Sequence, residues 1–509
     1  MSAVPTQFDV IVVGAGHNGL VTAAYLARAG RKVLVLEQAA TPGGQLAAGR
    51  LPAGFDGPAL HAGGRLRPDI VRDLDLSRHG LTTTDAAEAP YVALLPGGDT
   101  LRLSSRPGDA ATIDAIRRLS PRDAARWPEF LAFMDAATGF IDAAYRTPMP
   151  RMERSEMLAN GLPLASLLWK LRRLGKRDLF RVMRSLSMSA QEFTDEWFEA
   201  ESLKAAIGAL AVHGMTLGAY SAGTGYTLLH NWLNRGGLAQ PRTTGTAITD
   251  ALVAALQGAG GELRTSSPVA RILVDQQRAT GVRLASGAEI HATRIVSAAE
   301  LRHTLLGLVG APELPPDYVW QAQSIKLRGS VAKVHLLTDG SHGLPDGTLV
   351  VAPTLRYLER AYDAAKYGAI SEQPYLEVTT SGHAVAIHVQ FAAYALRQGD
   401  WQSARAALEQ RAIDTLAQYA PALRSSIRAV HSITPLDLEQ QWGLTEGDLN
   451  HGQLILDQAL FMRPMPGWSD HRTPIDGLYL CGSGVHGGGG ISGASGRNAA
   501  RAILQAAGR

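Results

Sequence analysis

The sequence predicts an α/β fold in which helices cover a central parallel sheet and a second, α+β domain is inserted. Three observations predict it. A buried strand, a glycine-rich turn and a helix open the chain, a similar strand–glycine–helix unit closes it, and 509 residues exceed one compact core. Glycine is also frequent, with 54 residues, as expected where tight turns bring the backbone close to a ligand.

The first unit opens with a continuous apolar run, residues 8–13, which is typical of a strand buried on both faces. Gly14, Gly16 and Gly19 follow as G-x-G-x-x-G and lead into a helix. A second buried strand then ends in Glu37, 18 residues after Gly19. The glycines make the turn, admit a diphosphate and let the helix pack closely, while the acid accepts from a ribose. This pattern predicts a Rossmann-type dinucleotide site, and the acid disfavours NADP.

A second glycine-rich segment, residues 482–496, lies between an apolar strand and the last helix. It also contains G-x-G-x-x-G, but only 22 residues follow Gly487, too few for another complete unit. We therefore interpret it as a second contact with the ligand of the first sheet, because the last helix directs its positive end there. Gly43 and Gly44 similarly allow a loop to cross close to a long ligand.

Composition excludes several classes of protein. Lys and Arg total 49 against 46 Asp and Glu, so the net charge of +3 argues against a nucleic-acid binder. The single cysteine, Cys481, excludes a disulfide framework, a redox dithiol and a thiolate zinc site, and indicates a reducing, cytoplasmic setting. No metal site is expected. We expect neither a targeting segment nor a membrane span, because no apolar run approaches ~20 residues.

Both ends of the chain resemble the phytoene desaturase-like branch of the FAD-dependent amine oxidase and carotenoid oxidoreductase superfamily. The resemblance lies in residues 9–44 and 457–500, with further similarity at 188–199, 220–230 and 281–298. It therefore runs the length of the chain. Within the branch, the sequence is most similar to the subgroup called pyridine nucleotide-disulfide oxidoreductase domain-containing protein 2, although one cysteine gives the disulfide part of that name no support.

The resemblance implies FAD as the cofactor and a set of contacts along it. In order along the coenzyme these are Val269 at the adenine, Glu37 beside Gln38 at the ribose, Gly14, Ala15, Gly16, Asn18 and Gly19 at the diphosphate, Gly44, Gln45 and Leu46 near the middle, Gly482 and Ser483 at the ribityl–phosphate arm, and Gly63, Ile491, Ser492 and Gly493 at the flavin. Many relatives have an acid where this chain has Ser483, which weakens the expected hydrogen bond to the ribityl chain.

The FAD domain is expected to be discontinuous, formed by residues 1–70, 241–320 and 470–509. Residues 71–240, mostly helical, and 321–469 then form the substrate domain. The implied activity is dehydrogenation, or desaturation, of a hydrophobic carotenoid- or isoprenoid-like molecule by hydride transfer to flavin N5. A flavin amine oxidase, a C=C saturase or isomerase, and a non-enzymatic binder of lipid or prenyl groups stay open, as does the electron acceptor.

The catalytic base is sought among the histidines, the residues that most often transfer protons. His230 is the first candidate, because it lies in a stretch that carries the resemblance. His17, His61 and His486 are also expected near the flavin, since they lie in or beside the segments that should approach it.

A helical stretch has two interpretations. Five leucines at helical spacing lie among five basic residues between positions 170 and 177. A basic amphipathic helix of this kind binds membrane interfaces, whereas an apolar stripe facing the core is the commoner structure. The chain is therefore expected in the cytoplasm, with peripheral membrane contact as the alternative. The leucines are Leu164, Leu167, Leu168, Leu171 and Leu174.

Overall fold

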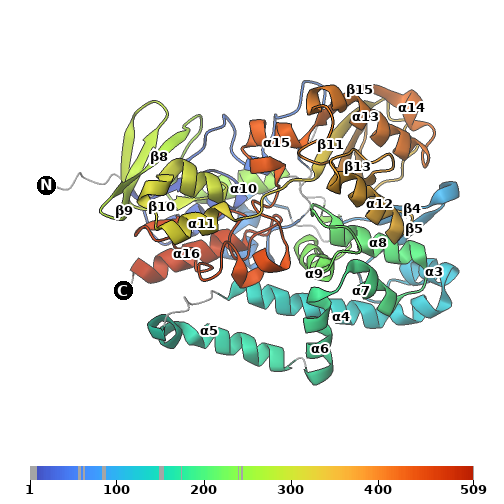
Figure 1. Ribbon diagram of the computed structural model, residues 1–509, viewed down its shortest axis with the longest axis horizontal. Coiled ribbons are helices and arrows are strands. Elements are labelled where there is room, and N and C mark those ends of the chain that lie inside the picture. The colour runs from blue at the N-terminus through green and yellow to red at the C-terminus, as the bar shows by residue number, and fades with distance from the viewer. Residues whose placement is uncertain are drawn as a thin grey trace.

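The computed structural model describes residues 8–55, 59–60, 64–82, 88–147, 154–173, 175–238, 240–241 and 245–507. Two seven-stranded sheets lie in two neighbouring units, and a group of helices extends beneath them (Figure 1). The predicted fold class, a parallel sheet with helices and a second α+β unit, is confirmed.

The first sheet is parallel at its centre and antiparallel at one edge. In spatial order its strands are β7 (Glu262–Arg264), β2 (Val33–Leu36), β1 (Phe8–Val13), β10 (Glu289–Ser297), β9 (Arg278–Leu284) and β8 (Val269–Asp275), with β16 (Leu478–Leu480) beside the end of β10. β1 pairs in parallel with β2 and β10, and β10 with β16. Strands from the beginning, middle and end of the chain therefore form one sheet.

Both faces of this sheet are covered, as the continuous apolar run in β1 predicts. Val10 and Val12 pack towards α1 (His17–Arg28), α10 (Gly245–Gly258) and α16 (Ala494–Ala507). Ile11 faces the opposite side, towards the π-helix η5 (His303–Gly310) and α11 (Pro316–Gln323). Side chains that alternate along one strand thus enter two separate cores.

Helices α1 and α16 cross at a glycine. A Cβ on Gly496 would lie 2.3 Å from the carbonyl oxygen of Asn18, so no larger residue fits without moving backbone. The Thr22 hydroxyl donates to the Gly496 carbonyl at 2.9 Å. This contact fixes the last helix against the first.

The second sheet is antiparallel except where β12 meets β4. In spatial order its strands are β15 (Ile427–Ile433), β11 (Val331–Thr338), β14 (Ala384–Gln390), β13 (Tyr375–Ser381), β12 (Thr348–Val351), β4 (Tyr91–Leu94) and β5 (Thr100–Leu103). The segment expected to be mostly helical therefore also supplies two strands at one edge. A two-stranded ladder joins β3 (Glu88–Ala89) to β6 (Gln240–Pro241).

Helices pack on both faces of the second sheet and below it (Figure 1). The largest apolar core lies between this sheet and the helices of residues 110–235, where Phe130 contacts Trp232 edge to face with ring centroids 5.7 Å apart. The remaining α-helices are α2 (Pro68–Asp73), α3 (Ala110–Leu119), α4 (Pro121–Arg146), α5 (Arg154–Arg173), α6 (Gly175–Ser187), α7 (Ala190–Trp197), α8 (Glu201–Val212), α9 (Thr224–Arg235), α12 (Leu355–Lys366), α13 (Trp401–Ala417), α14 (Leu423–Ser426) and α15 (Pro435–Trp442).

Candidate functional site

A cavity of about 380 Å³ lies at the carboxyl ends of the parallel strands. Val13 ends β1, Leu36 ends β2, and Ala298 follows β10, and all three line the cavity. In the sheet, β2 lies on one side of β1 and β10 on the other, so the strand order changes direction at β1. Open α/β sheets bind their ligands at such a reversal point.

The glycine-rich turn forms one wall of this cavity. A Cβ on Gly19 would lie 2.2 Å from the Gly14 carbonyl oxygen, which shows how closely α1 approaches the turn. A Cβ on Gly16, by contrast, would meet no described atom within 4 Å. Among the described residues no side chain caps α1, and its first turn contains no acidic residue. The N–H groups of that turn, which no helix can satisfy internally, are therefore available to an anion at Gly16.

Glu37 forms the adjacent wall and is 7% exposed. Its carboxylate accepts from the backbone N–H of Ala15 at 2.7 Å and of Ala39 at 2.9 Å. A carboxylate has about four lone-pair positions, so it can still accept from hydroxyl groups in the cavity. Gln38 and Val269 line the same region.

The second glycine-rich segment reaches the cavity through Gly482 and Ser483. The Asn18 side-chain amide donates to the Ser483 hydroxyl at 3.3 Å. The backbone carbonyl of Ser483 accepts from the Nη2 of Arg463 at 2.9 Å. Arg463 is buried and also donates to the Gly452 carbonyl, so it fixes the loop from the inserted domain.

Two histidines face this cavity with unused ring nitrogens. Burial lowers the pKa of His17 and of His451 to about 4, so both are neutral at pH 7. Within the described part of the chain, His17 Nε2 and His451 Nδ1 have no hydrogen-bond partner. His451 was missed in the sequence because only the folding of the inserted domain brings it to the phosphate loop. Buried polar atoms without partners in a cavity indicate that a polar ligand satisfies them.

The structure brings most of the predicted cofactor residues together. Those that line the cavity are Gly14, Gly16, Asn18, Gly19, Glu37, Gln38, Gly44, Gln45, Val269, Gly482 and Ser483. Ala15, Leu46, Ile491, Ser492 and Gly493 are not among its lining residues. Gly63 and His61 lie outside the described residues. Residues that the sequence did not reveal also contribute, among them Arg50, Glu300, Glu439, Trp442 and Thr445.

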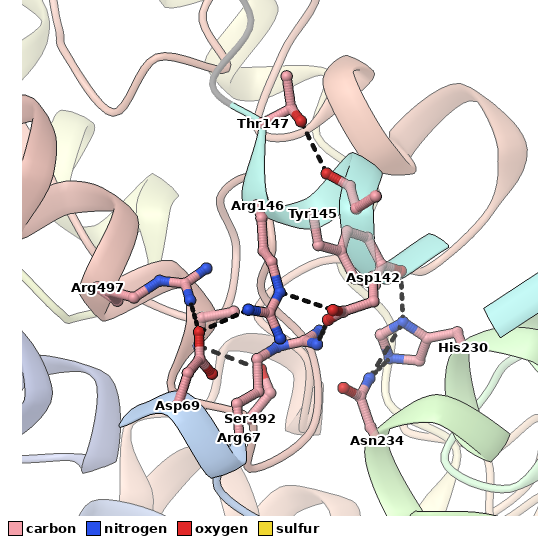
Figure 2. Close-up of polar contacts among 12 residues, drawn as sticks. Arg67, Asp69, Asp142, Tyr145, Arg146, Thr147, His230, Asn234, Ser492 and Arg497 are labelled. Carbon is pink, nitrogen blue, oxygen red and sulfur yellow. Dashed lines mark hydrogen bonds and ion pairs between the residues drawn. The ribbon is translucent and has the colours of Figure 1, made fainter. Parts of the chain in front are cut away.

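His230 belongs to a buried polar chain rather than to the cavity wall (Figure 2). Its Nδ1 lies 2.6 Å from the Tyr145 hydroxyl, which lies 2.7 Å from that of Tyr226. The Asn234 amide nitrogen contacts its Nε2 at 3.0 Å. Burial lowers the pKa of His230 to about 3, so it is neutral at pH 7, and its catalytic role stays a prediction. Its ring packs against the loop at Gly489, where a Cβ would lie 2.8 Å away.

The other histidine predicted near the flavin, His486, is also buried. Both of its ring nitrogens contact backbone carbonyls, Nδ1 that of Leu460 and Nε2 those of Ala144 and Thr147. These contacts connect the glycine-rich segment to the end of α4.

A second buried group of titratable residues lies on the inserted sheet. Lys333 Nζ lies 2.9 Å from His388 Nδ1, and the His388 ring stacks on His213 with centroids 4.1 Å apart. Glu377 accepts two hydrogen bonds from Arg235, at 2.9 and 3.0 Å. Burial lowers the pKa of Lys333 to about 7. The sequence did not reveal this group, since its members come from separate strands and helices.

The parallel sheet, the phosphate loop and the closing C-terminal helix define a dinucleotide-binding α/β protein. A family model described as flavin containing amine oxidoreductase matches residues 19–504, and the chain belongs to this family. It is 30% identical to pyridine nucleotide-disulfide oxidoreductase domain-containing protein 2 of Rattus norvegicus, covering 98% of this chain and 94% of that protein. It is 26% identical to the phytoene desaturase (lycopene-forming) of Pseudescherichia vulneris, covering 95% of this chain and 96% of that protein.

Among solved structures, the fold is similar to that of cyclohexylamine oxidase from Brevibacterium oxydans, with a TM-score of 0.56 over 99% of this chain and all of that one. At 18% identity this likeness concerns the fold alone. The chain is an FAD-dependent oxidoreductase, as the sequence predicted. Disulfide exchange has no basis here, because burial raises the pKa of the single thiol, Cys481, to about 12.

Proposed function

We propose that the chain dehydrogenates a hydrophobic small molecule with FAD bound in the 380 Å³ cavity. The observation that carries the proposal is the placement of both glycine-rich segments and Glu37 around one cavity. The name of one relative, the phytoene desaturase of Pseudescherichia vulneris, denotes comparable chemistry. FAD would supply the hydride acceptor: the substrate would lose a hydride to it and a proton to solvent or to a base, and would gain a C=C bond.

In this proposal the residues of the chain bind and orient the coenzyme. Within the turn at 14–19, the amide protons of Gly14 and Ala15 bond to Leu36 and Glu37, so the amide protons that follow them donate to the diphosphate, with the positive end of α1 behind them. Glu37 accepts from the adenosine ribose through the lone pairs that Ala15 and Ala39 leave unused. His17 and His451 bind polar atoms further along the coenzyme. Both are neutral, and each has one ring nitrogen without a partner among the described residues.

Anaerobic mixing of the purified holoprotein with substrates of two classes tests this function. We expect an apolar terpenoid or carotenoid extract to bleach the flavin and one of its components to lose two hydrogens by mass. A primary amine is the second substrate, because an amine oxidase is the main alternative. Bleaching by the amine alone would contradict the proposal, while a C=C saturase would instead add two hydrogens from pre-reduced flavin.

We also propose that α5 and α6 lie on an anionic membrane surface. The described helices include none long and apolar enough to cross a bilayer, but these two expose large apolar side chains. Leu168 and Trp169 are 57% and 54% exposed on α5, and Phe180 and Met183 are 70% and 49% exposed on α6. Arginines and lysines lie beside them in the sequence of both helices; Arg177, Arg181 and Arg184 pair with Glu129 or Glu196, and the others favour acidic lipid headgroups. Both helices lie at the margin of the molecule, away from the two sheets (Figure 1).

Flotation with phosphatidylserine-containing vesicles tests the membrane proposal. Leu167 is only 9% exposed, so substituting it would disturb the fold rather than the surface. We expect Leu168→Glu with Phe180→Glu to abolish flotation at low salt. Trp320→Glu is the control, because Trp320 is 68% exposed on a different helix, α11. Equal flotation of the two variants would contradict membrane contact through α5 and α6.

A further inference from the structure

A second cavity, of about 550 Å³, lies apart from the first, and no described residue lines both. Its walls are one face of α4, the end of α9 and the segment 65–68. Leu131 and Trp232 give it apolar walls, and both are almost fully buried. Arg67, Asp142, Arg146 and Asn234 give it a polar region. The cavity is therefore amphipathic.

The polar region belongs to an ion cluster, which Figure 2 shows in full. Its members are Arg67, Asp69, Asp142, Arg146 and Arg497. Asp142 pairs with Arg67 and with Arg146, the latter at 2.6 Å, and Asp69 pairs with Arg146 at 2.6 Å and with Arg497. Three guanidinium groups thus share two carboxylates. Because arginine stays protonated, the cluster carries a net charge of +1.

Unused hydrogen-bonding groups accompany this excess charge. Arg67 is 5% exposed, and within the described chain its Nε and Nη2 have no hydrogen-bond acceptor. The region also holds two acceptors without a donor among the described residues, Asn234 Oδ1 and Asp69 Oδ1, and these do not contribute to anion binding. Arg146, with 36% of its side chain exposed, brings the charge of the cluster to the cavity. Unsatisfied buried donors beside an uncompensated positive charge point to an anion.

We propose that this cavity binds an amphipathic organic acid, with its carboxylate at Arg146 and Arg67 and its apolar body along Leu131 and Trp232. A carboxylate carries the single negative charge that the cluster lacks, and its two oxygens match the fork of a guanidinium group. The exposed residues Arg65 and Asp135 also line the cavity, and their opposite charges leave this balance unchanged. The inference goes beyond the proposed dehydrogenation and does not depend on it.

Two substitutions remove the site while preserving the fold. Arg146→Gln makes the cluster neutral, yet Asp142 keeps Arg67 and Asp69 keeps Arg497 as partners. Gly139→Leu fills the cavity, because Gly139 lines it within α4 and a Cβ there meets no described atom within 4 Å. Leucine also favours the helix over glycine, so stability should not fall.

Each substitution has a matched control on the same helix outside the cavity. Arg122→Gln removes an arginine that pairs with Glu199 at the surface, and Ala125→Leu adds the same side chain at an exposed position. Octanoate serves as the acid and octylamine as a probe of equal length and opposite charge. Binding is measured by titration calorimetry on the FAD-loaded protein, so that the first cavity is filled.

We expect octanoate to bind the wild type and both controls equally and to bind Arg146→Gln and Gly139→Leu at least about tenfold more weakly, equivalent to ~1.4 kcal/mol. Octylamine should not bind. Three results would overturn the proposal: no octanoate binding to the wild type at millimolar concentration, equal affinity in Gly139→Leu and Ala125→Leu, or octylamine binding as tightly as octanoate. The readout is independent of turnover, so failure of the proposed dehydrogenation would leave it interpretable.

Discussion

Substitution by alanine at two glycines of the phosphate loop should have opposite effects on the apoprotein. At Gly19, the new Cβ would lie 2.2 Å from the Gly14 carbonyl oxygen and 3.0 Å from the Ala298 Cβ. At Gly16, it would meet no described atom within 4 Å and would extend into the cavity. Gly19→Ala therefore perturbs packing, whereas Gly16→Ala perturbs only the space reserved for a ligand.

The magnitudes follow from these distances. An ordinary C···O contact is about 3.3 Å, so α1 must move by about 1 Å in Gly19→Ala, and overpacking of this kind costs about 1–3 kcal/mol. The backbone of Gly16 has φ −67° and ψ 166°, which alanine adopts freely, so Gly16→Ala should gain about 0.4–1 kcal/mol. For FAD, losing one charge-assisted hydrogen bond to the diphosphate costs about 1.5–3 kcal/mol, roughly 10- to 150-fold in Kd.

Urea unfolding of the apoproteins and fluorescence titration with FAD measure the two effects separately. Gly258→Ala, at the end of α10 and outside the cavity, is the control, since its Cβ would make only an ordinary contact, 3.5 Å from His79 Cε1. Wild-type FAD affinity in Gly16→Ala would refute the placement of the diphosphate at residues 14–19. A destabilised Gly16→Ala apoprotein would refute the claim that its Cβ enters empty space.

Three further predictions concern buried charges and hydrogen bonds. Glu37→Gln should weaken FAD binding about tenfold in a titration of the apoprotein, because it removes the charge from the ribose acceptor, while Glu262→Gln on the exposed surface should not. Lys333→Met should stabilise the protein most at and below about pH 7, because the folded pKa of about 7 lies below the unfolded 10.5. Between these values folding releases a proton, so the difference in unfolding free energy between the variant and the wild type should shrink as pH rises, by at most ~1.4 kcal/mol per pH unit, in urea unfolding. A pH-independent difference would contradict it. Tyr145→Phe should cost about 1–3 kcal/mol in the same assay, because His230 and Tyr226 lose a shared partner, whereas Tyr220→Phe at an exposed position should be neutral.

The sequence predicted the first sheet well because local signals specify it. The run at residues 8–13, the glycines that follow and Glu37 lie within one short segment, and each has one structural role. The contribution of the last residues was also predictable, since residues 482–496 repeat the glycine pattern before a helix. In both cases the backbone lies so close to a ligand or a helix that only glycine fits, and glycine can be recognised directly in the sequence.

The parts that the sequence did not predict depend on long-range packing. His451 and Trp442 reach the coenzyme cavity only because the inserted domain folds against the first sheet. The five-membered ion cluster joins α2, α4 and α16, and no spacing along the chain relates Asp69 to Arg497. The exposed apolar side chains are a different case. Helical spacing predicted a leucine stripe on α5, but packing against α4 and Leu460 decides which leucines are buried, so that Leu167 lies inside and Leu168 outside.

The contact between α1 and α16 has a consequence for biosynthesis. The phosphate loop is synthesised several hundred residues before the end of the fold. β16, which completes the sheet, and Gly496, which packs against Asn18, follow only then. The sheet of a nascent chain therefore lacks β16 until synthesis reaches residue 478. Until then the end of β10 is an unpaired edge, which makes the chain prone to aggregation. Premature termination anywhere upstream of residue 478 would leave a product unable to close around its flavin, and so a natural target for chaperones and proteases.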